Sequence, residues 1–218
     1  MISPEQDNWD AYAEGTAKRA DATLPTVHWT QYENHGPGAE LIDSARRVLD
    51  LGFGSGAAVA ALCRAGVDAE GVDLSPVAGK LAAERWPDVD SARFVLAEAS
   101  DFLAHTDNTY DALISYFGAM WFTDPQRLLP PAYERLAPGG RLVFAQPPPI
   151  PGCYGPQGMY KGGFAGKATY VRRWCYTPET WKVLLEHHGF TRIEAREVVA
   201  PNPGHIATLL VQARKPNQ

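Results

Sequence analysis

VLDLGFGSG, residues 48–56, is the stretch of this 218-residue sequence that decides its fold. The apolar residues before Gly52 predict a short buried strand, and the small residues after Gly54 predict the start of a helix. Three glycines at alternate positions allow a tight turn and let a ligand approach the backbone closely. A glycine-rich turn between a strand and a helix is typical of nucleotide-binding α/β folds, and it leaves the ligand itself open.

Strand and helix patterns alternate along the chain on both sides of this turn. Strands are predicted at 47–51, 68–74, 92–97, 110–117, 141–146, 191–200 and 207–215, and an amphipathic helix at 178–189. Such alternation implies a parallel sheet that is covered on both faces. We therefore predict an α/β protein with a Rossmann-like, doubly wound, mostly parallel seven-stranded sheet. The last two strands would form an antiparallel hairpin at one edge.

Composition restricts the partners that the chain is expected to have. The net charge of −5 and the pI of about 5.7 disfavour nucleic acid, because phosphate backbones recruit basic surfaces. We find no apolar run of the ~18–20 residues that a membrane span needs, and no signal peptide at the polar N-terminus. Cys63, Cys153 and Cys175 form no CxxC pair, so we expect reduced thiols and neither a disulfide framework nor a metal site. These features predict a cytoplasmic protein and leave its oligomeric state unknown.

Acidic residues follow the next two strands. Asp73 ends the second strand, where a carboxylate accepts hydrogen bonds from the two ribose hydroxyls of an adenosyl group. Glu98-Ala99 follows the third strand, where an adenine edge would lie. LAPGGRLVF, residues 136–144, places a turn before the fifth strand. Together these positions raise the expectation of an adenosyl-containing ligand.

The series VLDLGFGSG, GVDLSP, AEASDF, YDALIS and LAPGGRLVF resembles the class I S-adenosylmethionine (SAM)-dependent methyltransferases. It is most similar to the small-molecule branch that contains ubiquinone-biosynthesis-type enzymes. The resemblance covers residues 45–146 well and the C-terminal part loosely. It implies SAM as cofactor and methyl transfer to a small-molecule or peptide-like acceptor, with S-adenosylhomocysteine (SAH) as product. Phe53 stands where the family usually has a small residue, and Glu98 stands where Asp is frequent.

The resemblance also implies a set of cofactor-binding residues. The glycines would line the methionine part of SAM, and Asp50 would help to hold its amino group. Asp73 would bind the ribose, Glu98 and Ala99 would meet the adenine edge, and Ser115 would close the pocket. The expected set is Asp50, Gly52, Gly54, Gly56, Asp73, Leu74, Glu98, Ala99 and Ser115.

Two alternatives share this architecture. One is an NAD(P)-binding oxidoreductase, which the GxGxG spacing disfavours because dinucleotide enzymes typically show GxGxxG. The other is a SAM-binding protein without catalytic activity, and the intact glycine turn does not exclude it. Formation of SAH from SAM in the presence of an acceptor would separate an enzyme from such a binding protein.

One domain of generous size accounts for the chain. Within it, residues 1–45 would form an N-terminal helical cap and residues 46–146 the SAM-binding core. Residues 147–177 would be a loop insertion on the substrate side, because long loops rich in Pro, Gly and aromatic residues are often binding loops. Residues 178–218 would supply the C-terminal helix and hairpin.

Catalytic residues remain unassigned, with His28 and His35 as the candidate general bases. Both lie in the N-terminal segment, near where this family caps its site, although a lone His is more often a packing or surface residue. Tyr116 and Trp121 follow the fourth strand, at the end of the sheet where open α/β folds place ligands. They are candidates for substrate binding, with core packing as the alternative.

Charge is distributed unevenly along the chain. From Arg135 to Pro178 there is no Asp or Glu, and a cleft lined by one sign of charge concentrates ligands of the other sign. The sequence therefore suggests an anionic acceptor, such as a carboxylate, which arginine binds with a planar pair of donors. Adjacent arginines in an extended segment point opposite ways, so at most one of the pair at 172–173 would face the site. The substrate-binding candidates in this stretch are Tyr160, Tyr170, Arg172 and Arg173.

Overall fold

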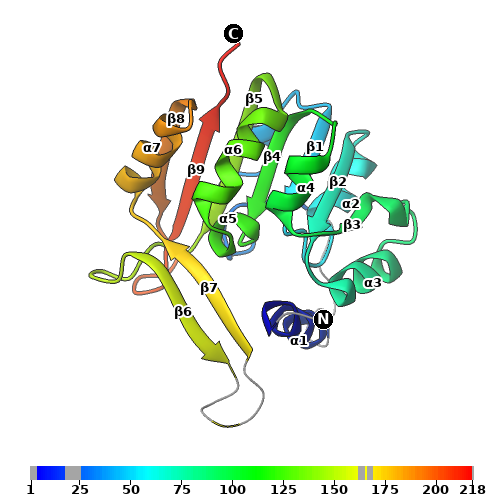
Figure 1. The fold of residues 1–218 in the computed structure, drawn as a ribbon, viewed down its shortest axis with the longest axis horizontal. Helices are drawn as coiled ribbons and strands as arrows, with labels where there is room; N and C mark the ends of the chain where they lie inside the picture. Colours follow the sequence, from blue (N-terminus) through cyan, green and yellow to red (C-terminus); the bar gives the residue numbers. More distant parts are fainter. Residues whose placement is uncertain (1–3, 18–25, 162–164, 166–168, 218) are drawn as a thin grey trace.

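A computed structural model of the chain describes residues 4–17, 26–161, 165 and 169–217. Seven strands form one sheet in the order β3-β2-β1-β4-β5-β9-β8 (Figure 1). The strands are β1 (Arg47–Leu51), β2 (Asp68–Asp73), β3 (Phe94–Leu96), β4 (Tyr110–Tyr116), β5 (Leu136–Gln146), β8 (Thr191–Val198) and β9 (Thr208–Arg214).

The direction of the strands confirms the predicted sheet. β1 to β5 pair in parallel, as in the register Leu49↔Leu113 between β1 and β4. β9 lies between β5 and β8 and is antiparallel to both. A short connection from β8 permits only an antiparallel return, whereas each parallel pair needs a crossover. The carboxyl ends of β1 to β5 therefore meet at one edge of the sheet.

Helices cover both faces of the sheet, because alternate strand residues point to opposite sides. Leu49 and Leu51 are fully buried on the face that α4, α6 and α7 cover, and Val48 is buried on the face of α2 and α3. Asp50 therefore points to the α2 side. The helices are α1 (Pro4–Ala17), α2 (Ala57–Arg64), α3 (Pro76–Arg85), α4 (Ala99–His105), α5 (Ala119–Phe122), α6 (Pro125–Arg135) and α7 (Pro178–His187). Among the described residues, no helix is both long and apolar enough to cross a membrane.

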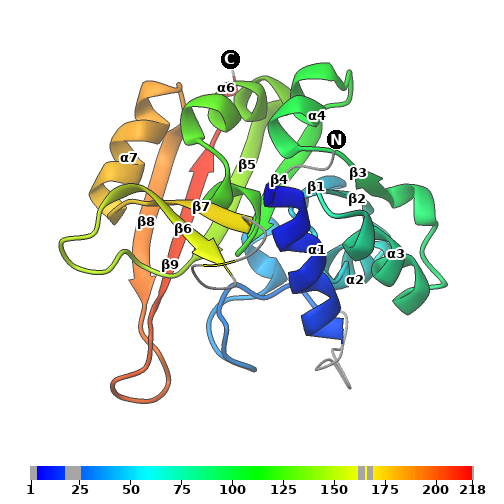
Figure 2. The ribbon, with the colours of Figure 1, turned by 60° about the horizontal axis from the view of Figure 1, so that its bottom comes forward.

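Two elements that are distant in sequence come together over the carboxyl edge of the sheet. α1 packs against α3 and against β7 (Thr169–Cys175), and Figure 2 shows it in front of the end of β4. β7 pairs antiparallel with β6 (Gly155–Lys161) in a separate two-stranded sheet. The segment 147–177, which we predicted as a loop, thus contains a β-hairpin. Its glycines and prolines suggested a loop, but cross-strand partners such as Tyr160 and Tyr170 support the pairing.

Candidate functional site

The glycine turn packs against the end of β2 and the loop after β4, at the carboxyl edge of the sheet. Gly52, Gly54 and Gly56 have φ angles of 89°, 52° and 72°, in the left-handed region that favours glycine. The Gly52 N–H donates to the carbonyl of Val72 at 2.8 Å. A Cβ atom at Gly52 would lie 2.9 Å from the Cα atom of Gly118, which is closer than packing allows. The turn therefore depends on glycine at position 52 to fit against the loop after β4.

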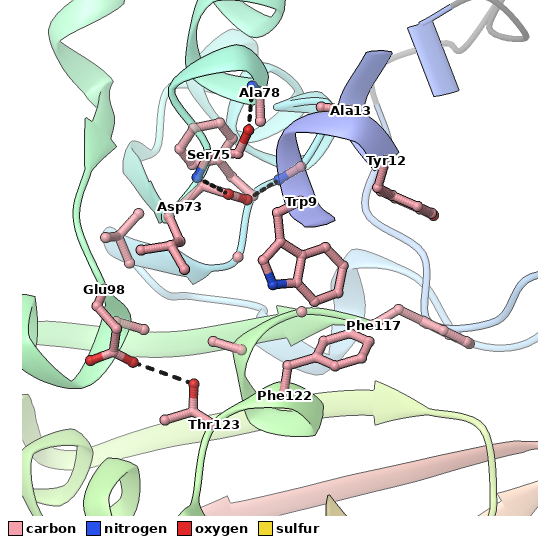
Figure 3. A pocket seen from close by; sticks show the side chains of 18 of the residues that line it. Trp9, Tyr12, Ala13, Asp73, Ser75, Ala78, Glu98, Phe117, Phe122 and Thr123 are labelled. Carbon is pink, nitrogen blue, oxygen red and sulfur yellow. Dashed lines mark hydrogen bonds between the residues drawn. The ribbon is translucent and has the colours of Figure 1, made fainter. Parts of the chain in front are cut away.

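This turn borders a cavity of about 570 Å³, which residues of α1 and β7 also line. We call it the larger cavity. Figure 3 shows Asp73 and Glu98 on one side of it, with Trp9, Phe117 and Phe122 on the other. Six of the nine predicted cofactor-binding residues line it. They are Gly52, Gly54, Asp73, Leu74, Glu98 and Ala99.

Asp73 is held in place by two backbone donors. Its Oδ2 accepts a hydrogen bond from the Gly54 N–H at 3.0 Å, and its Oδ1 accepts one from the Ser75 N–H at 2.9 Å. Burial raises the pKa of the Asp73 carboxyl, while these hydrogen bonds oppose the shift. Each carboxylate oxygen can accept two hydrogen bonds, so the Asp73 carboxylate keeps acceptor capacity for a ligand.

Glu98 is the N-cap of α4. Its Oε2 accepts hydrogen bonds from the Asp101 N–H at 3.0 Å and from the Ser100 hydroxyl, and lies 3.8 Å from the Arg127 guanidinium. Its Oε1 accepts only a long hydrogen bond of 3.4 Å from the Thr123 hydroxyl. One oxygen thus stabilises the helix, and the other has acceptor capacity toward the cavity.

Aromatic rings and one ion pair form the part of the larger cavity that is farther from Asp73. The Trp9 and Phe122 rings are 4.5 Å apart, centroid to centroid, and Trp174 also lines this part. Arg172 Nη2 lies 2.8 Å from Glu5 Oε2, so the ion pair links β7 to α1. Among the described residues that line the larger cavity there is no His or Cys.

A smaller cavity of about 200 Å³ lies on the other side of the glycine turn. Asp50 lines it and is 4% exposed, and its Oδ1 has no hydrogen-bond partner. Burial, with the charge of Asp73 as a second cause, raises the pKa of Asp50 to about 7. His28 lines the same cavity, and burial lowers its pKa. Tyr116 lines both cavities.

Two predicted cofactor-binding residues shape the turn and line neither cavity. A Cβ atom at Gly56 would lie 2.7 Å from the Phe94 ring, so this glycine allows close packing of α2 on the core. The buried Ser115 hydroxyl donates to the Leu51 carbonyl at 2.8 Å and accepts from the Met120 N–H at 3.2 Å. It joins the ends of β1 and β4, which sequence spacing alone did not indicate.

Four predicted substrate-binding residues also lie outside both cavities. Arg173 donates from Nε to Gln157 Oε1 at 3.2 Å and lies 5.9 Å from the Trp121 ring centroid. Tyr160 is 70% exposed, and its ring packs edge-on against Tyr170 on the hairpin. Arg173 follows Arg172 in β7, so the alternation of side chains along the strand turns it away from the cavity. Tyr160 and Tyr170 contact each other on the hairpin, and Trp121 contacts Arg173 and Phe122.

His35, the second candidate base, is also outside both cavities. One of its ring nitrogens lies 2.8 Å from the Val199 carbonyl, so it attaches the N-terminal segment to the β8–β9 loop. The larger cavity is also lined by residues that no sequence pattern indicates as site residues, among them Glu5, Phe117, Phe122 and Trp174. They come from three separated segments, and no local pattern in the sequence brings them together.

The geometry matches what comparisons with known proteins find. Residues 49–144 match the methyltransferase domain family. A demethylmenaquinone methyltransferase from Thermus thermophilus is 37% identical over 122 residues, which are 53% of this chain and 54% of that protein. A trans-aconitate 2-methyltransferase from Delftia acidovorans is 31% identical over 123 residues, which are 53% of this chain and 45% of that protein. The chain thus spans about half the length of the curated relatives it matches.

Comparison of the whole structure agrees on the fold. The DhpI–SAH complex superimposes with a TM-score of 0.69 at 17% identity, and the match covers 100% of this chain and 98% of that one. At this level of identity the likeness establishes the Rossmann-like architecture alone. The order of motifs and the matched family favour a methyltransferase over the dinucleotide-binding alternative.

Proposed function

We propose that this protein is a class I methyltransferase, which binds SAM and transfers its methyl group to a small-molecule acceptor, because residues 49–144 match the methyltransferase domain family. The observation that carries the proposal is the Asp73 carboxylate. It ends β2, accepts hydrogen bonds from the Gly54 and Ser75 amides, and lines the larger cavity. A carboxylate in this place suits the two hydroxyls of a ribose.

The adenine end would lie between β2 and α4. Leu74 supplies an apolar surface, and Glu98 Oε1 supplies an acceptor for an exocyclic amino group. Ala99 is the first residue of α4, so its N–H has no acceptor within the helix and can donate to a ring nitrogen. A donor beside an acceptor is the pattern that an adenine edge requires.

From the ribose, the methionine part of SAM would cross Gly52 toward Asp50. The sulfonium of SAM supplies an electrophilic methyl group. The chain would hold the acceptor in line with it, against the Trp9 and Phe122 rings, and alignment of this kind contributes ~7–11 kcal/mol in favourable cases. A carboxylate or amine acceptor then needs no general base, which fits the larger cavity, whose described lining residues include no His.

We further propose that the acceptor is anionic and meets Arg172. Arg172 is the arginine of the 172–173 pair that lines the larger cavity, and the aromatic residues beside it suit a flat or apolar acceptor body. A matched relative is named for trans-aconitate, which is a carboxylic acid. Since Glu5 already pairs with Arg172, the acceptor anion would share the guanidinium fork or displace Glu5.

A cytoplasmic location, one domain and no nucleic-acid partner remain predictions.

Replacing Asp73 by Ala tests the cofactor site. We expect SAM binding, measured by calorimetry on folded protein, to weaken roughly tenfold to a hundredfold, since hydrogen bonds to charged groups contribute about 1.5–3 kcal/mol. Asp73→Asn should have a smaller effect because it keeps one acceptor oxygen. Asp88→Ala is the matched control, because Asp88 pairs with Arg64 on the surface.

Two results would contradict the proposal. Unchanged SAM affinity in Asp73→Ala would mean that the ribose site is misassigned. Tight NADH binding by the parent protein, with no SAM binding, would favour an oxidoreductase. If SAM binds but no acceptor yields SAH, the protein is a SAM-binding protein without catalytic activity.

A further inference from the structure

The smaller cavity contains a buried acid that has no partner. Asp50 is 4% exposed, and its Oδ1 makes no hydrogen bond with the described residues. An unpaired buried oxygen is unfavourable, so the site is chemically incomplete until a donor enters. The cavity volume of about 200 Å³ leaves room for a small polar group beside it.

Hydrogen-bond donors line other parts of the smaller cavity. Ala57 and Ala58 open α2, and the first N–H groups of a helix lack intrahelical acceptors and favour an anion. His28 adds a ring nitrogen, and Thr26 adds a hydroxyl. An acid together with several N–H and O–H donors suits a ligand that carries an ammonium and a carboxylate on adjacent atoms.

We propose that His28 binds the carboxylate of the cofactor's amino-acid end, and so selects cofactors that retain this end, instead of acting as a general base. The inference rests on the proposed function, because it takes SAM as the ligand. Gly52 lines both cavities, so an extended cofactor can place its adenosyl part beside Asp73 and its amino-acid end beside Asp50.

His28 lies away from the larger cavity, in which we place the acceptor. It lines the smaller cavity and not the larger one, and Tyr116 stands between the two, with its ring centroid 4.6 Å from that of His28. The Tyr116 hydroxyl donates to the Thr30 carbonyl at 3.0 Å, which fixes the segment carrying His28 against β4. Among the residues lining the smaller cavity, the other titratable side chains are Asp50 and Tyr116. Burial lowers the pKa of His28, and a bound carboxylate would favour its charged form again.

The test compares two probes that differ only in this end of the cofactor. SAH carries the amino-acid end, and 5′-methylthioadenosine lacks it. We expect His28→Phe, which keeps a ring against Tyr116, to bind SAH roughly tenfold to a hundredfold more weakly in calorimetry. Affinity for methylthioadenosine should stay unchanged. His28→Gln, which keeps an N–H donor, should recover part of the SAH affinity.

His35→Gln is the matched control, since His35 is in the same segment and lines neither cavity. It should leave both affinities unchanged. Equal weakening of SAH and methylthioadenosine in His28→Phe would overturn the proposal, because it would indicate a role in folding. Unchanged SAH affinity with a reduced kcat would also overturn it, in favour of a base. Failure of the parent protein to bind either probe would instead reject the proposed function.

Discussion

Asp50, in strand β1, has a strongly raised pKa. Its pKa in the folded protein is raised to about 7, from an ordinary value of 3.8, mainly by burial. The folded state therefore holds a proton that the unfolded state releases between these two pH values. Stability from this group is present at low pH and is lost as pH rises toward 7.

We predict that Asp50→Asn changes the pH profile of the cofactor-free protein. The variant should be more stable than the parent at pH 8 and closer to it at pH 5, in urea unfolding at both values. Asp88→Asn serves as control because the ion pair with Arg64 lowers the pKa of Asp88, so Asp88 is ionised at both pH values and its replacement should change stability equally at pH 5 and pH 8. Parallel profiles for Asp50→Asn and the parent would show that Asp50 is ionised in both states.

At the scale of elements, α1 and β7 together cover the larger cavity. Trp9 packs on Phe122, and Asp10 accepts a 2.5 Å hydrogen bond from the Ser75 hydroxyl, so α1 is attached at two points to the sheet side. The Glu5–Arg172 ion pair attaches it to the hairpin. Half-exposed ion pairs contribute little to stability, so a ligand can compete for this one.

The adjacent arginines offer a matched pair of substitutions. Arg172→Gln should raise the Michaelis constant for an anionic acceptor several-fold and leave SAM affinity intact, because Arg172 lines the cavity. Arg173→Gln should leave that constant unchanged, since Arg173 contacts Gln157 and Trp121 instead. Steady-state kinetics with an identified acceptor gives the comparison. A cationic acceptor, or equal effects of the two substitutions, would contradict the assignment.

At the scale of the whole molecule, the two cavities join residues from Glu5 to Trp174. A ligand that fills them contacts α1, the sheet edge and β7 at once, so it should stabilise the fold as a unit. SAH at about a hundred times its dissociation constant adds about 2.7 kcal/mol. For a chain of this length, this corresponds to a rise in melting temperature of roughly 5–11 °C.

Thermal unfolding with SAH, NADH and no ligand measures this effect. NADH at the same concentration should give no comparable shift. The Asp73→Ala protein should show a smaller rise with SAH than the parent, while Asp88→Ala should match the parent. A rise with NADH alone would support the oxidoreductase alternative.

The sequence by itself determined the sheet and the glycine turn. Local patterns specify these features: a short, mostly apolar run from Val48 to Leu51, glycines with left-handed φ angles, and Asp73 at a strand end. Parallel strands then bring their carboxyl ends to one edge, where six of the residues that the family resemblance indicated meet in one cavity. Asp73 and Glu98 could be placed because each is adjacent in sequence to the strand that positions it.

Only the tertiary structure decided which side chains complete the two cavities. Glu5 meets Arg172 across 167 positions of sequence, and the hairpin turns Arg172 inward and Arg173 away. His28 and His35 look alike in sequence, yet one lines a cavity and the other contacts the Val199 carbonyl. Such contacts depend on how separated segments pack, and packing is set by the summed fit of many side chains rather than by a local pattern.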